Sequence, residues 1–236
     1  SNDEETAQTA SSISKYIRDE GSWVAEDHIN RPDVRSVFGI SGDGLITIEG
    51  EDSTTLTILN WRAAMRGGEA ATGISTALSA PAQSVVVDDD LLWVGVFQKG
   101  VELIDLSSLD TDDPHPRFNT PGRALATRAG RSYIVVADGF AGLSIFLKRA
   151  DSGLEIISPA RKLVTPPQEV PTSGRVVDLD LLEGRVVSAE WGAGIGLSVI
   201  DPELGVQRQW VTAIDGEVSG VRFVDPYTAL AWIKGK

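Results

Sequence analysis

Short runs in which hydrophobic and polar residues alternate follow one another from residue 34 to the end of the chain. Residues 131–146, RSYIVVADGFAGLSIF, contain two such runs separated by ADGFAG. A period of two residues is typical of a β-strand with one buried face, and Asp or Gly between two runs marks a turn or loop. This stretch therefore predicts two strands joined by a short connection.

The same pattern is written several times. Four segments each predict a strand, a tight turn, a second strand, a Gly-containing loop and a third strand: 37–59, 84–105, 124–146 and 176–201. A fifth copy, 220–236, has only the first two strands. The turn centres lie about 41 to 54 residues apart, and a period of roughly 40–50 residues with several strands per unit is typical of a β-propeller blade. We therefore predict an all-β fold, a β-propeller of about five blades.

These repeats also predict the domain organisation. Residues 1–12, SNDEETAQTASS, are polar and acidic and lack the apolar groups that a core needs, so we expect a disordered N-terminal segment. Residues 13–236 are expected to form a single propeller domain. The repeat units within it start near residues 34, 82, 122, 174 and 218.

The third unit resembles a known repeat family. Residues 120–146, TPGRALATRAGRSYIVVADGFAGLSIF, are similar to the LVIVD-repeat family of bacterial β-propellers. The matching residues are Ala124, Gly130, Tyr133, Val136, Ala137, Asp138, Gly139, Gly142, Leu143 and Ile145. The second and fourth units match more loosely, and the first and fifth match mainly in rhythm. The resemblance implies a propeller fold and supplies no catalytic residues, because the family motif is structural.

The incomplete fifth unit raises the question of how the last blade is completed. Residues 12–29 predict a strand, an Asp-Glu-Gly turn and a second strand. Placed beside residues 220–234, these N-terminal strands would close the final blade. The alternative is that the chain is part of a longer propeller, left incomplete by truncation or processing, with the remaining blades on a partner chain.

Charge narrows the classes of partner. The chain has 34 acidic residues against 21 Lys and Arg, a net charge of −13. Nucleic-acid binding depends on a basic surface, so we expect no nucleic-acid partner.

No apolar run approaches the ~18–20 residues of a membrane helix, so no membrane span is expected. The absence of cysteine excludes disulfides and thiolate chemistry but leaves the compartment open; we favour an exported, periplasmic or cell-surface, protein over a cytoplasmic one.

Candidate binding residues lie in the loops between second and third strands. Loops at the same place in each unit of a propeller emerge on the same face. Phe97, Phe140 and Trp191 occupy these loops, and we expect them to form an aromatic surface together with Lys99 and Glu190. Aromatic residues are enriched at interface hot spots. The alternative is that they only cover the ends of the core.

Candidate metal ligands and catalytic groups are sparse. The chain has two histidines and no nucleophile or nucleotide-binding motif. Asp110, Asp112 and Asp113 could supply oxygen ligands to a calcium ion, although their spacing matches no known calcium loop. The alternative is a solvated turn, and we expect no cofactor.

Two functional classes remain. We favour a non-catalytic protein-binding or scaffold module. The alternative is a propeller enzyme, or a ligand- or metal-binding propeller, with an axial carboxylate site. Its candidate carboxylates are Glu49, Asp178, Asp180 and Glu190. Metal content distinguishes the two, since a tightly held axial metal favours the second.

Overall fold

The structure is a computed structural model that describes part of the chain. The described ranges are 12–19, 22–30, 34–39, 44–60, 73–107, 114–131, 133–148, 168–201 and 205–234. Every regular element in these ranges is a β-strand, so the predicted all-β class is confirmed. The chain divides into two compact units, Ser1–Leu78 and Ser79–Lys236. Each unit is described by itself.

The first unit contains two antiparallel sheets. Its strands are β1 (Ser12–Asp19), β2 (Ser22–Asn30), β3 (Val34–Gly39), β4 (Gly44–Glu49), β5 (Thr55–Asn60) and β6 (Ile74–Ala77). β1 pairs with β2, and the other strands form a four-stranded sheet in the order β3-β4-β5-β6. Ile46, Ile48 and Leu56 are fully buried in this sheet. Thr47 and Thr57, which lie between apolar positions of the alternating pattern, are also buried, so both faces of the central strands are covered.

The second unit contains three four-stranded sheets and one two-stranded sheet. The first sheet has β7 (Ala82–Asp88), β8 (Leu91–Val96), β9 (Gly100–Asp105) and β10 (Arg117–Phe118); the second has β11 (Ala126–Ala129), β12 (Tyr133–Ala137), β13 (Leu143–Leu147) and β14 (Gln168–Val170); the third has β15 (Arg175–Leu182), β16 (Arg185–Trp191), β17 (Gly194–Asp201) and β18 (Gly205–Thr212). The last sheet pairs β19 (Glu217–Asp225) with β20 (Thr228–Lys234). Within every sheet, neighbouring strands are consecutive in the chain and antiparallel.

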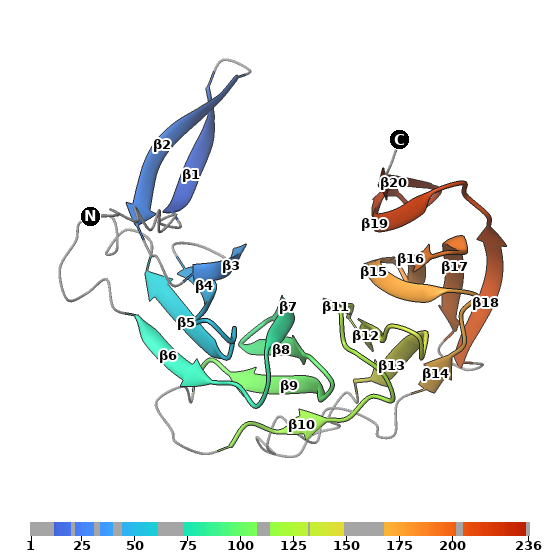
Figure 1. Cartoon of the computed structure of the whole chain (residues 1–236), viewed down its shortest axis with the longest axis horizontal. Coiled ribbons are helices and arrows are strands. Elements are labelled where there is room, and N and C mark those ends of the chain that lie inside the picture. Colours follow the sequence, from blue (N-terminus) through green and yellow to red (C-terminus); the bar gives the residue numbers. More distant parts are fainter. Residues whose placement is uncertain are drawn as a thin grey trace, which may run out of the picture. The chain divides into compact units, whose positions relative to one another are not determined.

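Successive sheets of the second unit lie face to face. The first strands are in contact from sheet to sheet: β11 contacts β7 and β15, and β15 contacts β19 (Figure 1). The run LLWVGV of β8 is buried at all six positions. A strand covered on both faces has no polar face, so its sequence is a continuous apolar run rather than an alternating one.

Three hydrophobic clusters fill the spaces between these sheets. Trp93, Phe118 and Phe146 belong to the cluster between the first two sheets, and their rings form a series in which neighbouring centroids are 6.0 Å apart. A second cluster joins the sheets β11–β14 and β15–β18, and a third joins β15–β18 to β19–β20. Face-to-face packing of successive sheets is therefore the main source of burial in this unit.

The last sheet differs from the others on its outer face. Leu230 and Trp232 on β20 are 56% and 50% exposed, whereas Trp93 on β8 is fully buried. Trp93 and Trp232 both lie on the second strand of their units, so their different exposure does not follow from their place in the repeat. The difference arises because no further sheet of the described second unit follows β20.

Candidate functional site

Three loops of the second unit carry the aromatic residues that the sequence singled out. Phe97 lies between β8 and β9, Phe140 between β12 and β13, and Trp191 at the end of β16. Phe140 is 88% exposed and Trp191 is 43% exposed, whereas Phe97 is half-buried. Lys99 is exposed in the same loop as Phe97. These aromatic side chains therefore face solvent to different degrees.

The guanidinium groups of two arginines lie against these aromatic rings. The guanidinium carbon of Arg123 lies 4.8 Å from the ring centroid of Phe97. That of Arg175 lies 5.8 Å from the centroid of Phe140 and 5.4 Å from that of Trp191. A guanidinium over an aromatic face is attracted by the negative face of the ring. We call these five residues the aromatic–arginine rim.

A groove runs beside the rim. Its volume is about 670 Å³, and it is lined by Gln98, Thr120, Pro121, Gly122, Arg123, Gly139, Phe140, Ala141 and Arg175. The lining residues come from the loop after β8, the segment before β11, the loop after β12 and the start of β15. Segments from three sheets thus contribute to one concave surface.

Glu190 does not belong to this surface. Its side chain is fully buried and accepts hydrogen bonds from the backbone N–H of Ser173 (3.0 Å) and from the hydroxyl of Ser188 (2.9 Å). Successive residues of a strand point to opposite faces, so Trp191 reaches the surface while Glu190 points inward. The predicted placement of Glu190 on the aromatic surface is corrected accordingly.

A repeated tetrapeptide supplies the two arginines. Thr-Pro-Gly-Arg at 120–123 precedes β11, and Thr-Ser-Gly-Arg at 172–175 runs into β15. Glycine is required at the third place because the neighbouring loop approaches closely. A Cβ on Gly122 would clash with the carbonyl oxygen of Asp138, and one on Gly174 would lie 2.6 Å from the carbonyl oxygen of Trp191. Our sequence analysis missed these arginines, although the Thr-x-Gly-Arg repeat could have revealed them.

The candidate axial carboxylates Asp178 and Asp180 lie in an ion-pair network. Asp178 contacts Arg222 at 2.5 Å and Arg128 at 3.5 Å, and Asp180 lies 3.6 Å from Arg128. The N–H groups of Val221 and Phe223 also donate to these carboxylates. Burial lowers the pKa of Arg128, as does Arg222, while both carboxylates raise it. The network joins β11, β15 and β19.

Metal ligation finds no support in the described ranges. Within them, no group of three or more His, Cys, Asp or Glu residues could hold a metal ion. Glu49 accepts hydrogen bonds from Thr47 and Thr57 in the first unit. The calcium candidates Asp110, Asp112 and Asp113 lie outside the described residues.

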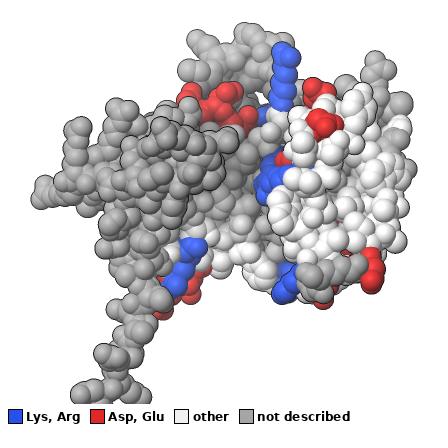
Figure 2. Space-filling model, turned by 90° about the horizontal axis from the view of Figure 1, so that it is seen from above, with Lys and Arg blue, Asp and Glu red and all other residues white. Residues whose placement is uncertain are grey.

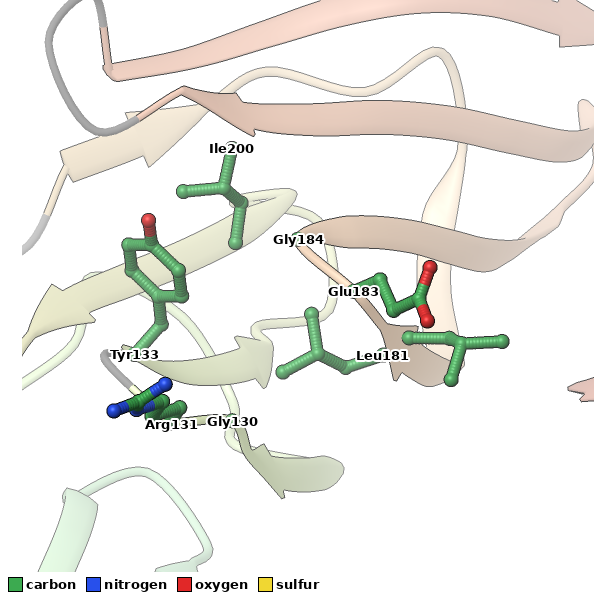
Figure 3. A pocket seen from close by; sticks show the side chains of 8 residues that line it. Gly130, Arg131, Tyr133, Leu181, Glu183, Gly184 and Ile200 are labelled. Carbon is green, nitrogen blue, oxygen red and sulfur yellow. The ribbon is translucent and has the colours of Figure 1, made fainter. Parts of the chain in front are cut away.

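A second pocket lies between the sheets β11–β14 and β15–β18. Its volume is about 460 Å³, and its lining includes Arg131, Tyr133, Leu181, Glu183 and Ile200. Figure 3 shows these side chains arriving from separate strands and turns around the space. Because none of the predicted site residues lines this pocket, the aromatic–arginine rim is the stronger candidate site.

Comparisons with known proteins describe only the fold. No protein-family model matches the chain, and no curated protein matches it. The chain is similar to the crystal structure of the computationally designed Ika8 protein, with a TM-score of 0.61 and 10% identity over 93% of this chain and 65% of that one. It is also similar to a chain in an S. cerevisiae complex of a dbp5 variant bound to nup159, a gle1 variant, ip6 and adp. There the TM-score is 0.57 with 9% identity over 84% of this chain.

The chain spans 65% and 52% of the lengths of those two chains. At such low identity the likeness concerns the fold alone. Among the residues that the structure describes, no helix is long and apolar enough to cross a bilayer.

Proposed function

We propose that this chain is a non-catalytic β-propeller of about five blades, of the LVIVD-repeat kind, that binds another protein. The arrangement of the second unit supports the propeller. Its sheets follow chain order, their first strands are neighbours from sheet to sheet, and each pair of successive sheets shares a hydrophobic cluster. One blade cannot bury both of its faces alone, so stacking several of them around an axis is the stable solution.

Closure of the ring is part of this proposal. The described residues contain four four-stranded sheets and two two-stranded sheets, β1–β2 and β19–β20. In our proposal β1 pairs with β20, so that the two short sheets become one four-stranded blade. The lengths are compatible, since β1 has 8 residues and β20 has 7. This pairing would give five blades of four strands each.

The observation that carries the binding function is the exposure of Phe140 and Trp191 beside a groove. Phe140 is 88% exposed and still lies next to Arg175, which also contacts Trp191. Exposed aromatic residues beside a concave surface are common at protein-binding sites, where aromatic and arginine side chains contribute much of the affinity. Packing of the core does not require a phenylalanine that is almost fully exposed.

Affinity capture tests this function. The protein is immobilised and its partner is captured from the source cells, with the double variant Phe140→Ala/Trp191→Ala compared in parallel. Tyr227→Ala is the matched control, because Tyr227 is also 88% exposed and lies in the turn between β19 and β20. We expect the double variant to lose the partner and the control to retain it. Unchanged capture by a folded double variant would reject the proposal.

A further inference from the structure

The charge that the groove presents is opposite to that of the whole chain. The chain has a net charge of −13, yet among the described residues that line the groove the charged ones are Arg123 and Arg175. Lys99 is exposed in the adjoining loop. Figure 2 shows one face, on which the described residues include small groups of Lys and Arg and of Asp and Glu among side chains of other kinds. A local reversal of sign favours a negatively charged partner.

The carboxylates nearest in sequence to this surface are engaged elsewhere. Asp138 is fully buried and accepts hydrogen bonds from the hydroxyl groups of Thr120 and Ser144 and from the N–H of Gly122. Glu190 is buried and bonded to Ser173 and Ser188. Both carboxylates are thus already hydrogen-bonded within the fold.

The two guanidinium groups are oriented and keep their donors available. Each is positioned by one or two aromatic rings. Within the described part of the chain, neither Arg123 nor Arg175 forms an ion pair or a side-chain hydrogen bond. A stacked guanidinium retains a planar set of N–H donors that matches a carboxylate in a bidentate manner. Stacking also reduces the entropy lost on binding, because the side chain is already positioned.

The origin of these two groups in different sheets favours several carboxylates over one phosphate. Arg123 lies in the segment before β11 and Arg175 is the first residue of β15, so the two guanidinium groups come from different sheets and each supplies its own set of donors to the groove. Phosphate sites usually gather several donors at one point. Phe140 also lines the groove and offers an apolar contact.

We infer that this groove binds an extended acidic peptide segment, with one carboxylate on Arg123, a second on Arg175 and an apolar side chain against Phe140. The inference rests on the proposed function, because it names the chemistry of the protein partner that the rim binds. Gln98, whose side chain is exposed in the groove lining, can donate to and accept from the backbone of such a segment.

Fluorescence anisotropy with synthetic peptides tests the inference. The probes are fluorescein-labelled peptides in which two Glu residues flank one Leu at increasing separations. Matched sets carry Gln or phosphoserine in place of Glu. We expect at least one Glu spacing to bind about tenfold more tightly than its Gln counterpart. We also expect the affinity to fall as salt is added.

Variants of the protein locate the binding. Arg123→Gln/Arg175→Gln should weaken the best Glu peptide about tenfold or more. Arg131→Gln, which removes an exposed arginine outside the groove, should leave the affinity unchanged. Far-ultraviolet circular dichroism and thermal melting confirm that the variants fold.

Several results would overturn the inference: equal binding of Glu and Gln peptides, preference for phosphoserine alone, or unchanged affinity in the double arginine variant. If Phe140→Ala/Trp191→Ala abolishes partner capture while the arginine substitutions do not affect it, the acidic-peptide inference fails and the proposed function stands. If capture survives the aromatic substitutions, the proposed function itself fails.

Discussion

The buried carboxylate of Asp138 accepts the backbone N–H of Gly122 at 2.8 Å, which fixes the segment before β11 to the sheet that follows it. A similar bond, from a backbone N–H of the connecting segment to a buried carboxylate, occurs in the two other four-stranded sheets of the second unit. Glu190 accepts the N–H of Ser173 at 3.0 Å, and Glu102 accepts that of Ser79 at 3.1 Å. All three carboxylates are at most 2% exposed. The repeat is therefore defined by a shared hydrogen bond as well as by strand order.

The carboxylate that accepts the backbone N–H of the connecting segment comes from different strands in different sheets. Glu190 pairs with Gly194 on the next strand, and the equivalent pair in the first sheet of the second unit is Val96 with Gly100. There the carboxylate comes instead from Glu102, two residues after Gly100. The requirement is for an acceptor near the N–H groups of the connecting segment, and either strand can provide it.

Replacement of Asp138 should destabilise the protein strongly. Asp138→Asn removes the negative charge and one acceptor oxygen from a buried position with three donors. We expect a loss of about 2 kcal/mol in the free energy of unfolding. Urea unfolding measures it, with Asp90→Asn as the control because Asp90 is exposed. A loss in Asp138→Asn no greater than in the control would show that the bond contributes little.

Trp93 should be the most sensitive aromatic position. It is fully buried and contacts Phe118 in the cluster between two sheets. Trp93→Ala should cost about 3–5 kcal/mol, since truncation leaves a cavity that the packed sheets cannot fill. Trp210→Ala, at a side chain that is 49% exposed, should cost about 1 kcal/mol or less. Similar midpoints of thermal unfolding for the two variants would contradict the described packing.

The Arg222–Asp178 pair should show energetic coupling that depends on salt. Arg222 is 43% exposed, so solvent screens the interaction. We expect a double-mutant cycle to give a coupling of about 0.5–1 kcal/mol, which decreases as ionic strength rises. A cycle between Arg117 and Asp178, which do not form an ion pair, is the control. Coupling that is absent at low salt would mean that the network does not hold β15 to β19.

Acid titration should detect the hydrogen bonds that the Asp225 carboxylate accepts in the turn between β19 and β20. The backbone N–H of Tyr227 donates to Asp225 at 2.7 Å. This bond and the Thr228 side chain lower the pKa of Asp225 below its usual range. A depressed pKa in the folded state stabilises the protein above the unfolded value of about 3.9. That stabilisation is lost as the pH falls through the folded-state pKa.

The comparison with Asp225→Asn measures this effect. Wild-type protein should be more stable than the variant near neutral pH, and the difference should shrink on acidification. NMR titration of the Asp225 carboxyl gives the folded-state pKa directly. A difference in stability that grows on acidification would contradict the assigned hydrogen bonds.

The strands and their grouping could be predicted because they depend on local patterns. Alternating apolar residues and turn residues such as Asp89 and Gly184 mark strands and their ends wherever a sheet face is buried. The continuous apolar run of β8 is typical of a buried strand, since a central strand covered on both faces needs no polar side, and all six of its positions are buried.

The site was predicted only in part because it depends on side-chain direction and on contacts between repeats. Glu190 and Trp191 are adjacent in the sequence but point to opposite sides of β16. Arg175 contacts Phe140, which lies in the loop between β12 and β13 of the preceding sheet. No pattern within one repeat indicates such a contact. Comparison of the segments before the first strands, where Thr-x-Gly-Arg recurs, would have pointed to both arginines.

Hydrogen exchange at β20 tests the proposed ring most directly. Among the described residues, β20 has one hydrogen-bonded neighbour, β19. If β1 completes the blade, the β20 amides that do not bond to β19 must also exchange slowly, as those of β8 should. Residue-resolved exchange of the monomeric full chain should therefore show protection along all of β20. Rapid exchange at alternate residues of β20, with protection only where it bonds to β19, would contradict a closed five-bladed propeller.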